Sequence, residues 1–210
     1  MPNLFKRIFS RTPMARSTRA YDFALEHLAL PPDQLVGNRP LILDVGTGKG
    51  NGTAYLSRRL PAAQIVTFDI SLDSLTRDEL TFGPRQPFFI QASAPNPPLA
   101  TASLDAVLLI MTFHCLPEPQ LVISEAARML KPGGALMIAD VDGQHWMARP
   151  FEWVEHLFIS PFTHAYTPEE LETLFTAAGL SDFTVYRRPG KEKGFMVWST
   201  ARKREGADGS

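Results

Sequence analysis

The segment from Leu41 to Gly52 constrains the fold of this chain more than any other. An apolar run containing one acid, Asp44, is followed by glycines at every second position up to Gly52. This pattern is typical of a buried parallel strand that enters a tight turn and then a helix. Glycine has no Cβ and tolerates positive φ, so the amides of such a turn can approach a ligand closely, and the helix start adds unpaired N–H groups. The segment therefore predicts a nucleotide-like ligand at the end of the strand.

The composition bounds the class of protein. The chain has 210 residues, of which 44% are hydrophobic and 20% charged, values ordinary for a water-soluble domain with a substantial core. Its net charge of −1 argues against a nucleic-acid partner. The single cysteine, Cys115, excludes an internal disulfide framework and fits a reducing compartment, so we expect a cytoplasmic protein. No apolar run is long enough to span a bilayer, and we expect no integral membrane segment.

Apolar strand-like runs alternate with amphipathic helical stretches, which predicts an α/β fold with a parallel sheet covered by helices. Strands are expected over residues 41–45, 64–68, 87–91, 104–111, 135–139, 183–187 and 195–200. Helices are expected over residues 14–28, 51–60, 71–80 and 119–130. Residues 131–134, Lys-Pro-Gly-Gly, are expected to form a turn. A last helix should begin with a capping box over residues 167–170 and end at Gly179.

No internal repeat and no linker interrupts this pattern, so residues 1–210 are expected to form a single domain. Residues 1–12 are expected to be a basic arm, since five basic residues precede the first acid, Asp22. We interpret the arm as solvated; a transit-like segment or a peripheral contact with a membrane surface are the alternatives. The tail, residues 201–210, is expected to be disordered.

Residues 144–166 form an aromatic-rich connection. It contains Phe151, Trp153, Phe158, Phe162 and Tyr166 among others. So many aromatic side chains in a connecting segment suggest a lid over an apolar, planar substrate. The alternative is a small satellite core beneath a long loop.

Two nucleotide-binding motifs do not fit the glycine turn. The dinucleotide fingerprint needs Gly-x-Gly-x-x-Gly, but Asn51 stands where its third glycine would fall. The phosphate loop needs a glycine where Leu43 stands, and Ser or Thr where Gly50 follows Lys49. Both readings therefore fail on spacing.

A third reading fits four motifs in order. An acid followed by Gly-x-Gly-x-Gly spans Asp44–Gly50, and a second acid, Asp69, ends the next strand. The segments 89–94 with 103–105, and Leu130-Lys131-Pro132-Gly133-Gly134, complete the set. With these motifs the chain resembles the class I S-adenosylmethionine-dependent methyltransferases, and within them the small-molecule branch related to quinone biosynthesis. The resemblance implies a Rossmann-like, seven-stranded, mostly parallel sheet with helices on both faces and the last strand antiparallel.

The resemblance also implies a set of cofactor-binding residues: Tyr21, Asp44, Gly46, Thr47, Gly48, Gly50, Asp69, Ile70, Ser93, Ala94 and Met111. Asp69 would accept both ribose hydroxyls and Ile70 would cover the adenine. Asp44 would orient the loop and the cofactor's ammonium; for both acids the alternative is ordinary helix capping. Tyr21 would close over the cofactor or merely pack its helix on the sheet.

Ser93 departs from the family pattern, which has an acid there to bind the adenine amine. A hydroxyl also accepts a hydrogen bond, but a neutral acceptor is about half as strong as an ionised one. The departure implies weaker cofactor binding or more reading by the backbone of Ala94. It also favours a non-catalytic protein or another adenosyl ligand.

The segments that leave the fourth and fifth strands should form a wall of the reaction chamber, because ligands lie beyond the carboxyl ends of parallel strands. They supply three candidate general bases, His114, Asp142 and His145. For each histidine the alternative is a structural role. The spacings of histidines and acids match no metal-ligand signature, so we expect no metal site.

The sequence thus predicts an enzyme that transfers a methyl group from S-adenosylmethionine to oxygen, nitrogen or carbon of a small, partly apolar metabolite. The alternatives are a non-catalytic adenosyl-binding or partner-binding protein and a nicotinamide-dependent reductase. A methyltransferase for nucleic acid or protein is disfavoured, because residues 111–114 are Met-Thr-Phe-His rather than an Asn-Pro-Pro-Tyr-type tetrapeptide. We expect a monomer or a homodimer.

Overall fold

The computed structural model describes residues 14–28, 39–71, 80–158, 160–188 and 194–204. The helices are α2 (Met14–His27), α4 (Asn51–Arg59), η2 (Phe113–Cys115), α5 (Pro119–Met129), α6 (Ala148–Phe158) and α7 (Pro168–Ala177). The strands are β1 (Leu41–Val45), β2 (Gln64–Asp69), β3 (Phe88–Gln91), β4 (Leu104–Ile110), β5 (Leu130–Val141), β6 (Leu180–Tyr186) and β7 (Met196–Lys203).

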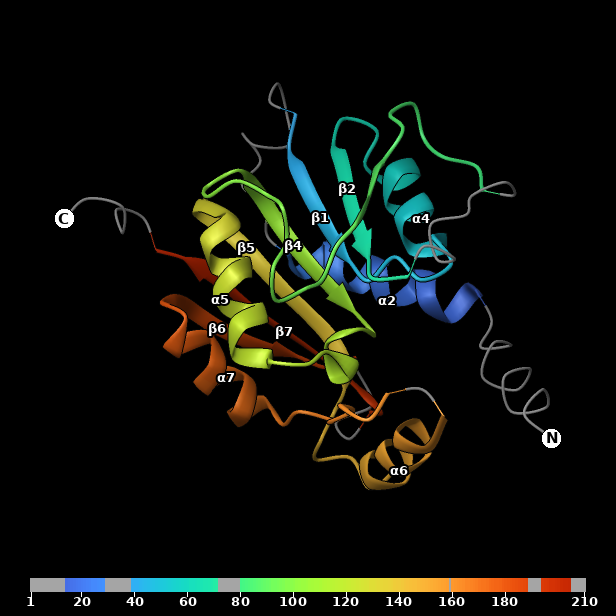
Figure 1. Cartoon of the computed structure of the whole chain (residues 1–210), viewed down its shortest axis with the longest axis vertical. Coiled ribbons are helices and arrows are strands. Elements are labelled where there is room, and N and C mark those ends of the chain that lie inside the picture. Colours follow the sequence, from blue (N-terminus) through green and yellow to red (C-terminus); the bar gives the residue numbers. More distant parts are fainter. Residues whose placement is uncertain (1–13, 29–38, 72–79, 159, 189–193, 205–210) are drawn as a thin grey trace.

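The seven strands form one sheet in the order β3-β2-β1-β4-β5-β7-β6 (Figure 1). β1 to β5 pair in parallel. β7 runs antiparallel to both β5 and β6, so β6 points the same way as the first five strands. The strand order reverses between β1 and β4, and parallel sheets bind ligands at the carboxyl ends of their strands at such a point.

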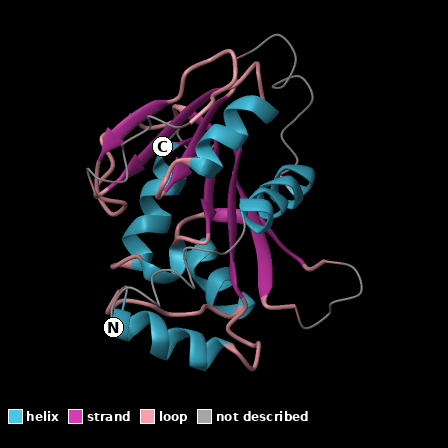
Figure 2. Ribbon diagram, turned by 90° about the vertical axis from the view of Figure 1, so that its right-hand side faces the viewer, coloured by secondary structure: helices cyan, strands magenta, loops and turns pink. Residues whose placement is uncertain are grey.

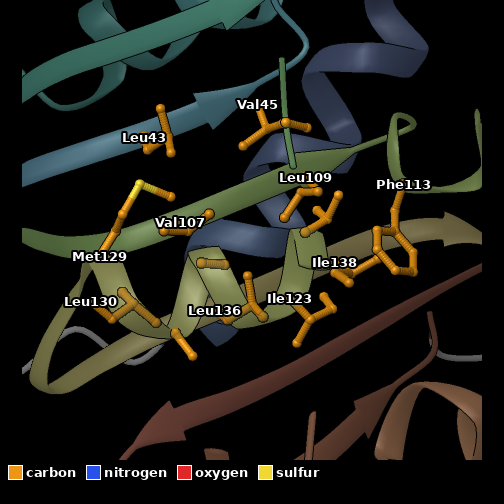
Figure 3. Packing of buried hydrophobic residues seen from close by; sticks show 14 of the residues in the cluster. Leu43, Val45, Val107, Leu109, Phe113, Ile123, Met129, Leu130, Leu136 and Ile138 are labelled. Atoms are coloured by element: carbon orange, nitrogen blue, oxygen red, sulfur yellow. The ribbon is translucent and has the colours of Figure 1, made fainter. Parts of the chain in front are cut away.

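Helices cover both faces of the sheet (Figure 2). Successive side chains of a strand point to opposite faces. On β1, Leu43 and Val45 therefore join the core under α5 and α7, whereas Ile42 joins the core under α2 and α4. Figure 3 shows the first of these cores, in which side chains of β1, β4 and β5 meet Ile123 of α5. Every residue of β4 is buried, as the centre of a doubly covered sheet requires.

The architecture confirms the predicted fold: a seven-stranded Rossmann-like sheet, mostly parallel, whose last strand is antiparallel. The capping box of α7 is also confirmed, because the Thr167 side chain accepts from the Glu170 amide and the Glu170 carboxylate accepts from the Thr167 amide. The helix expected over residues 71–80 lies outside the described residues except for its two ends, as do the basic arm and most of the tail.

The structure differs from the prediction in β5, β6, β7 and the aromatic connection. β6 begins at Leu180 rather than at residue 183. β5 begins at Leu130, before the expected turn, because Lys131 pairs with Asp105 of β4 at 2.8 Å and holds this segment against the sheet. The register between β4 and β5 shifts there, and Gly133 absorbs the turn with a φ of 77°. β7 continues to Lys203, so residues 201–203 belong to the sheet rather than to the tail. The aromatic connection contains a helix, α6.

Within the described residues, no helix is both long and apolar enough to cross a membrane.

Candidate functional site at the carboxyl edge of the sheet

A cavity of about 310 Å³ opens beside the carboxyl ends of β1, β2 and β4. The ends of β1 and β2 and the segments that follow β1, β2, β3 and β4 supply most of its wall, with one contribution from the segment after α6. Its described lining is Val45, Gly46, Phe68, Asp69, Ile70, Ala92, Ser93, Ala94, Pro95, Thr112, Cys115, Leu116, Pro117 and Phe162. Five of the predicted cofactor residues are among them: Gly46, Asp69, Ile70, Ser93 and Ala94.

The glycine turn brings backbone close to this cavity. Gly46 has a φ of 77° and its amide donates to the Phe68 carbonyl of β2 at 3.0 Å. A Cβ added to Gly46 would collide with the Thr112 side chain that follows β4. A Cβ on Gly50 would lie 2.5 Å from Leu80. Glycine at positions 46 and 50 therefore allows the turn to lie against the side chains of Thr112 and Leu80.

Asp69 is the last residue of β2, and its side chain binds the glycine turn that follows β1. Its two carboxylate oxygens accept from the Gly48 and Ser71 amides, each at 3.0 Å. An ionised carboxylate has about four acceptor sites, and the described residues use two of them. The next residue, Ile70, is 73% exposed although it is large and apolar, and it lines the cavity. A carboxylate that can accept hydrogen bonds from a ligand thus lies beside an apolar side chain.

Ser93 and Ala94 lie after β3 on the wall of the same cavity. The Ser93 carbonyl accepts from the Asn96 amide at 3.1 Å, and this tight turn presents both residues to the cavity. Ser93 is half-buried there.

Asp44 is buried beneath the turn and does not line the cavity. One carboxylate oxygen accepts from the Tyr21 hydroxyl of α2 at 2.9 Å, and the other accepts from the Thr53 hydroxyl of α4 at 2.6 Å. Burial raises the pKa of Asp44 to about 6, although the two hydrogen bonds lower it. Thr47 extends the network, because its hydroxyl lies 3.0 Å from that of Thr53.

Tyr21 packs α2 against the sheet, which is the alternative weighed from the sequence. It is 5% exposed, and burial raises the pKa of its hydroxyl well above the ordinary value. A Cβ on Gly52 would collide with its ring. A closing role over the cofactor stays a prediction.

Met111, also predicted at the site, follows β4 in the left-handed region with a φ of 54°. Such a backbone is strained for any residue other than glycine. The Met111 amide donates to the Ala139 carbonyl of β5 at 2.8 Å, which holds this conformation. The side chain is exposed and is not part of the described cavity lining.

His114 lies in η2, behind the cavity wall. Its Nδ1 lies 2.7 Å from Asp140, near the end of β5, and its Nε2 lies 3.8 Å from Glu155 of α6. Burial lowers the pKa of His114, but the carboxylates of Asp140 and Glu155 outweigh it and raise the pKa above the ordinary value. Burial raises the pKa of Glu155. The ring therefore links three elements and does not face the cavity.

The other two candidate bases occupy the turn between β5 and α6. Asp142 accepts from the Arg187 guanidinium at 2.9 Å and from the Gln144 amide at 3.0 Å. His145 Nδ1 accepts from the Met147 amide at 3.1 Å, just before α6. Neither side chain is among the residues that line the described cavity. Their catalytic roles stay predictions.

Several lining residues were not among the predicted cofactor or catalytic residues, although their segments were expected at the site: Thr112, Cys115 and Phe162. Burial, with the nearby carboxylates of Asp140 and Glu155, raises the pKa of Cys115 to about 11, so it is a thiol at neutral pH. The signal for the first two was their position directly after β4. Phe162 carried only the general aromatic signal of its segment.

The aromatic segment divides between the two roles expected for it. Phe151 packs on a small buried cluster of Val141, Ala148 and Ala165, which is a satellite core. Other large apolar side chains of the segment are exposed, and Phe162 reaches the cavity. The role of a lid stays a prediction.

Comparisons with known proteins agree with this geometry. Residues 43–138 match a family model described as a methyltransferase domain. A phthiotriol/phenolphthiotriol dimycocerosates methyltransferase from Mycobacterium ulcerans is 30% identical over 61% of this chain and 45% of its own length. A fatty-acid O-methyltransferase from Mycolicibacterium smegmatis is 29% identical over 57% of this chain and 43% of its own.

The crystal structure of an S-adenosylmethionine-dependent methyltransferase from Archaeoglobus fulgidus superposes with a TM-score of 0.70, at 14% identity, over 95% of this chain and 98% of that one. Residues 43–138 thus match a methyltransferase domain, and the whole chain shares the fold of that crystal structure. The resemblance to S-adenosylmethionine-dependent methyltransferases that the four motifs predicted is thereby confirmed. S-Adenosylmethionine is the cofactor named for that crystal structure. The quinone-biosynthesis branch stays a prediction.

The methyltransferase domain contains the glycine turn, Asp69 and the turn after β4, and so covers most of the cavity wall. The aromatic segment and β6 and β7 lie outside the matched range. The chain spans less than half the length of the curated relatives it matches.

Proposed function

We propose that the protein binds S-adenosylmethionine in the cavity at the carboxyl edge and transfers its methyl group to a small, lipid-like acceptor. One observation carries the proposal. Within a methyltransferase domain, the glycine turn after β1 and the Asp69 carboxylate after β2 face one cavity that is otherwise mostly apolar. An adenosyl ligand needs this combination of a close backbone, a carboxylate and an apolar wall.

The residues present fit such a ligand. Asp69 would accept the ribose hydroxyls with the acceptor sites that its two backbone bonds leave. Ile70 and Ala94 would contact the adenine ring, and the Ser93 hydroxyl would accept from its amine. The turn, Gly46, Thr47, Gly48 and Gly50, would pass beneath the amino-acid tail. Asp44, Tyr21 and Met111 would then act from behind this layer.

The chemistry favours positioning over proton transfer. Methyl transfer from a sulfonium is an in-line displacement, and alignment alone supplies effective molarities of about 10⁵ M or more. Among the described lining residues the only carboxylate is Asp69, and Cys115 is a protonated thiol. An acceptor that is nucleophilic without a base, such as a carboxylate, suits this wall. His114 is then a positioning residue that links η2, β5 and α6.

The relatives support an apolar acceptor. Their names describe methylation of a fatty acid and of phthiotriol lipids. The described cavity wall includes Phe68, Leu116, Pro117 and Phe162, which suit a hydrocarbon chain. We propose a small molecule rather than a nucleic acid as the acceptor, and a monomer or a homodimer as the working form.

Ser93 favours one other candidate. A neutral residue at the adenine position weakens cofactor binding, so the protein could be a non-catalytic adenosyl-binding relative. It would bind S-adenosylhomocysteine without turning over any acceptor.

Calorimetric titration with S-adenosylmethionine, S-adenosylhomocysteine and NADH tests the proposal. We expect binding of the two adenosyl ligands only, and loss of that binding in Asp69→Ala. The control Glu172→Ala removes an exposed acid from α7 and should bind as the wild type does. NADH binding alone, or unchanged binding in Asp69→Ala, would contradict the assignment.

A methyl-transfer assay separates the two candidates. Radiolabelled S-adenosylmethionine is incubated with fatty acids of increasing chain length. Methyl-ester product supports the enzyme, whereas cofactor binding without product across carboxylate, hydroxyl and amine acceptors supports the non-catalytic protein.

A further inference from the structure

Helix α6 buries its acids and exposes its apolar side chains, the reverse of an ordinary surface helix. Glu152 and Glu155 are 8% and 6% exposed. Trp153 and Leu157 are 69% and 61% exposed. In Figure 1, α6 stands apart from the helices that cover the sheet, at the edge toward which β4 points.

Polar contacts hold α6 in this orientation. Glu152 accepts from the Ala165 amide at 2.8 Å and lies 3.2 Å from the His164 ring. Glu155 faces His114 at 3.8 Å. Rolling the helix to bury Trp153 would leave these carboxylates without their partners, and a buried unpaired charge is strongly unfavourable. The exposed apolar face is therefore built into the fold.

The apolar surface extends beyond the helix toward the cavity. Trp146, just before α6, is 78% exposed, and Phe162, just after it, is 56% exposed. Phe162 also lines the cavity, and the Ser160 hydroxyl donates to the Cys115 carbonyl in the cavity wall at 3.1 Å. We call Trp146, Trp153, Leu157 and Phe162 the α6 apolar face. It ends where the proposed acceptor would enter.

The charges on α6 suit one kind of partner. Both of its carboxylates point inward, so the ionisable side chains that it exposes are His156 and Arg149. The Arg149 side chain is 82% exposed, although its guanidinium reaches Glu152 at 2.9 Å. A face of tryptophan and leucine bordered by an exposed arginine suits the interface of a lipid bilayer. Arginine stems also cover apolar surface while the guanidinium stays with the headgroups.

We propose that the α6 apolar face docks on an anionic lipid surface, and that the acceptor passes from that surface along Phe162 into the cavity. The docking is inferred from the exposed side chains of the α6 apolar face alone, whereas the route of the acceptor rests on the proposed function. A patch of exposed large apolar side chains of this kind marks an interaction site.

Co-sedimentation with phosphatidylcholine vesicles that contain phosphatidylglycerol tests the docking. The wild type should bind. The double variant Trp153→Glu with Leu157→Glu should weaken binding at least about tenfold, because two apolar side chains that would enter the bilayer are replaced by anions. Leu121→Glu is the matched control: Leu121 is 47% exposed on α5, and this variant should bind as the wild type does.

Intrinsic fluorescence gives a second readout. The chain has three tryptophans, of which Trp146 and Trp153 are exposed and Trp198 is 2% exposed. Vesicles should shift the emission of the wild type to the blue, since the exposed indoles leave water. The buried indole should contribute no change.

Three results would overturn the inference. The first is that the wild type does not bind vesicles. The second is that the double variant binds undiminished, which would place the contact elsewhere, for example in the basic N-terminal segment. The third is that light scattering shows a dimer that the double variant abolishes, without vesicle binding. Titration of the same samples with S-adenosylhomocysteine separates the two proposals. Cofactor binding without vesicle binding overturns only the docking, and the converse overturns only the proposed function.

Discussion

Asp44 should make the stability of this protein fall as the pH rises through 6, and replacement by asparagine should remove that dependence. The carboxyl is 1% exposed, and burial raises its pKa from 3.8 to about 6. The folded state therefore holds the proton more tightly than the unfolded state. The resulting stabilisation is present below pH 4 and is lost as the pH rises through about 6. Between pH 4 and pH 8 the loss is about 2.5 kcal/mol.

Asparagine can keep the network of Asp44. Its carbonyl accepts from Tyr21, and its amide can donate to the Thr53 hydroxyl, which then turns toward Thr47 at 3.0 Å. Urea unfolding of the wild type and Asp44→Asn at pH 4 and pH 8 measures the effect, because other titrating groups cancel in the difference. The stability advantage of the wild type over the variant should drop by about 2.5 kcal/mol. A difference that does not change with pH would refute the reasoning.

The ionisation of Asp44 should also affect cofactor binding. If the cofactor's ammonium lies near Asp44, binding favours the ionised carboxylate, and the affinity of the wild type for S-adenosylhomocysteine rises as the pH passes 6. Asp44→Asn should show no such rise. A flat profile in the wild type would leave Asp44 a purely structural role between α2 and α4.

Three further predictions concern the site. Gly46→Ala should destabilise the protein more than Gly48→Ala, because both pay about 1–3 kcal/mol for positive φ but only the first collides with Thr112; equal losses in urea would contradict the close packing. Ser93→Asp should tighten S-adenosylhomocysteine binding in calorimetry if the adenine lies against this turn, and weaker binding would mean that it does not. His114→Gln should lose stability mainly at low pH, because the raised pKa makes the stabilisation present below the ordinary histidine pKa and lost as the pH rises through the folded value; a loss that grows with pH would refute the ion pairs.

The strand, turn and helix from Leu41 to Arg59 could be predicted because the deciding interactions are local. Glycines at fixed offsets from an apolar run specify the turn without reference to distant residues. Asp69 followed from the same logic, since the carboxyl ends of neighbouring parallel strands meet at one edge.

The surroundings of His114 could not be predicted in this way. Its partners, Asp140 and Glu155, are 26 and 41 positions away, and nothing in the local pattern pairs them. α6 was missed for a related reason. Its acids point inward while Trp153 and Leu157 point outward, the reverse of the pattern by which a surface helix is recognised.

The protonated thiol of Cys115 has a consequence for a protein that handles an alkylating reagent. A sulfonium seated in this cavity would face a sulfur nucleophile in the wall, and a thiolate there would compete with the intended acceptor. With a pKa of about 11, only about one thiol in ten thousand is ionised at pH 7. Burial of the thiol, together with the carboxylates behind the wall, thereby protects the protein from methylating itself.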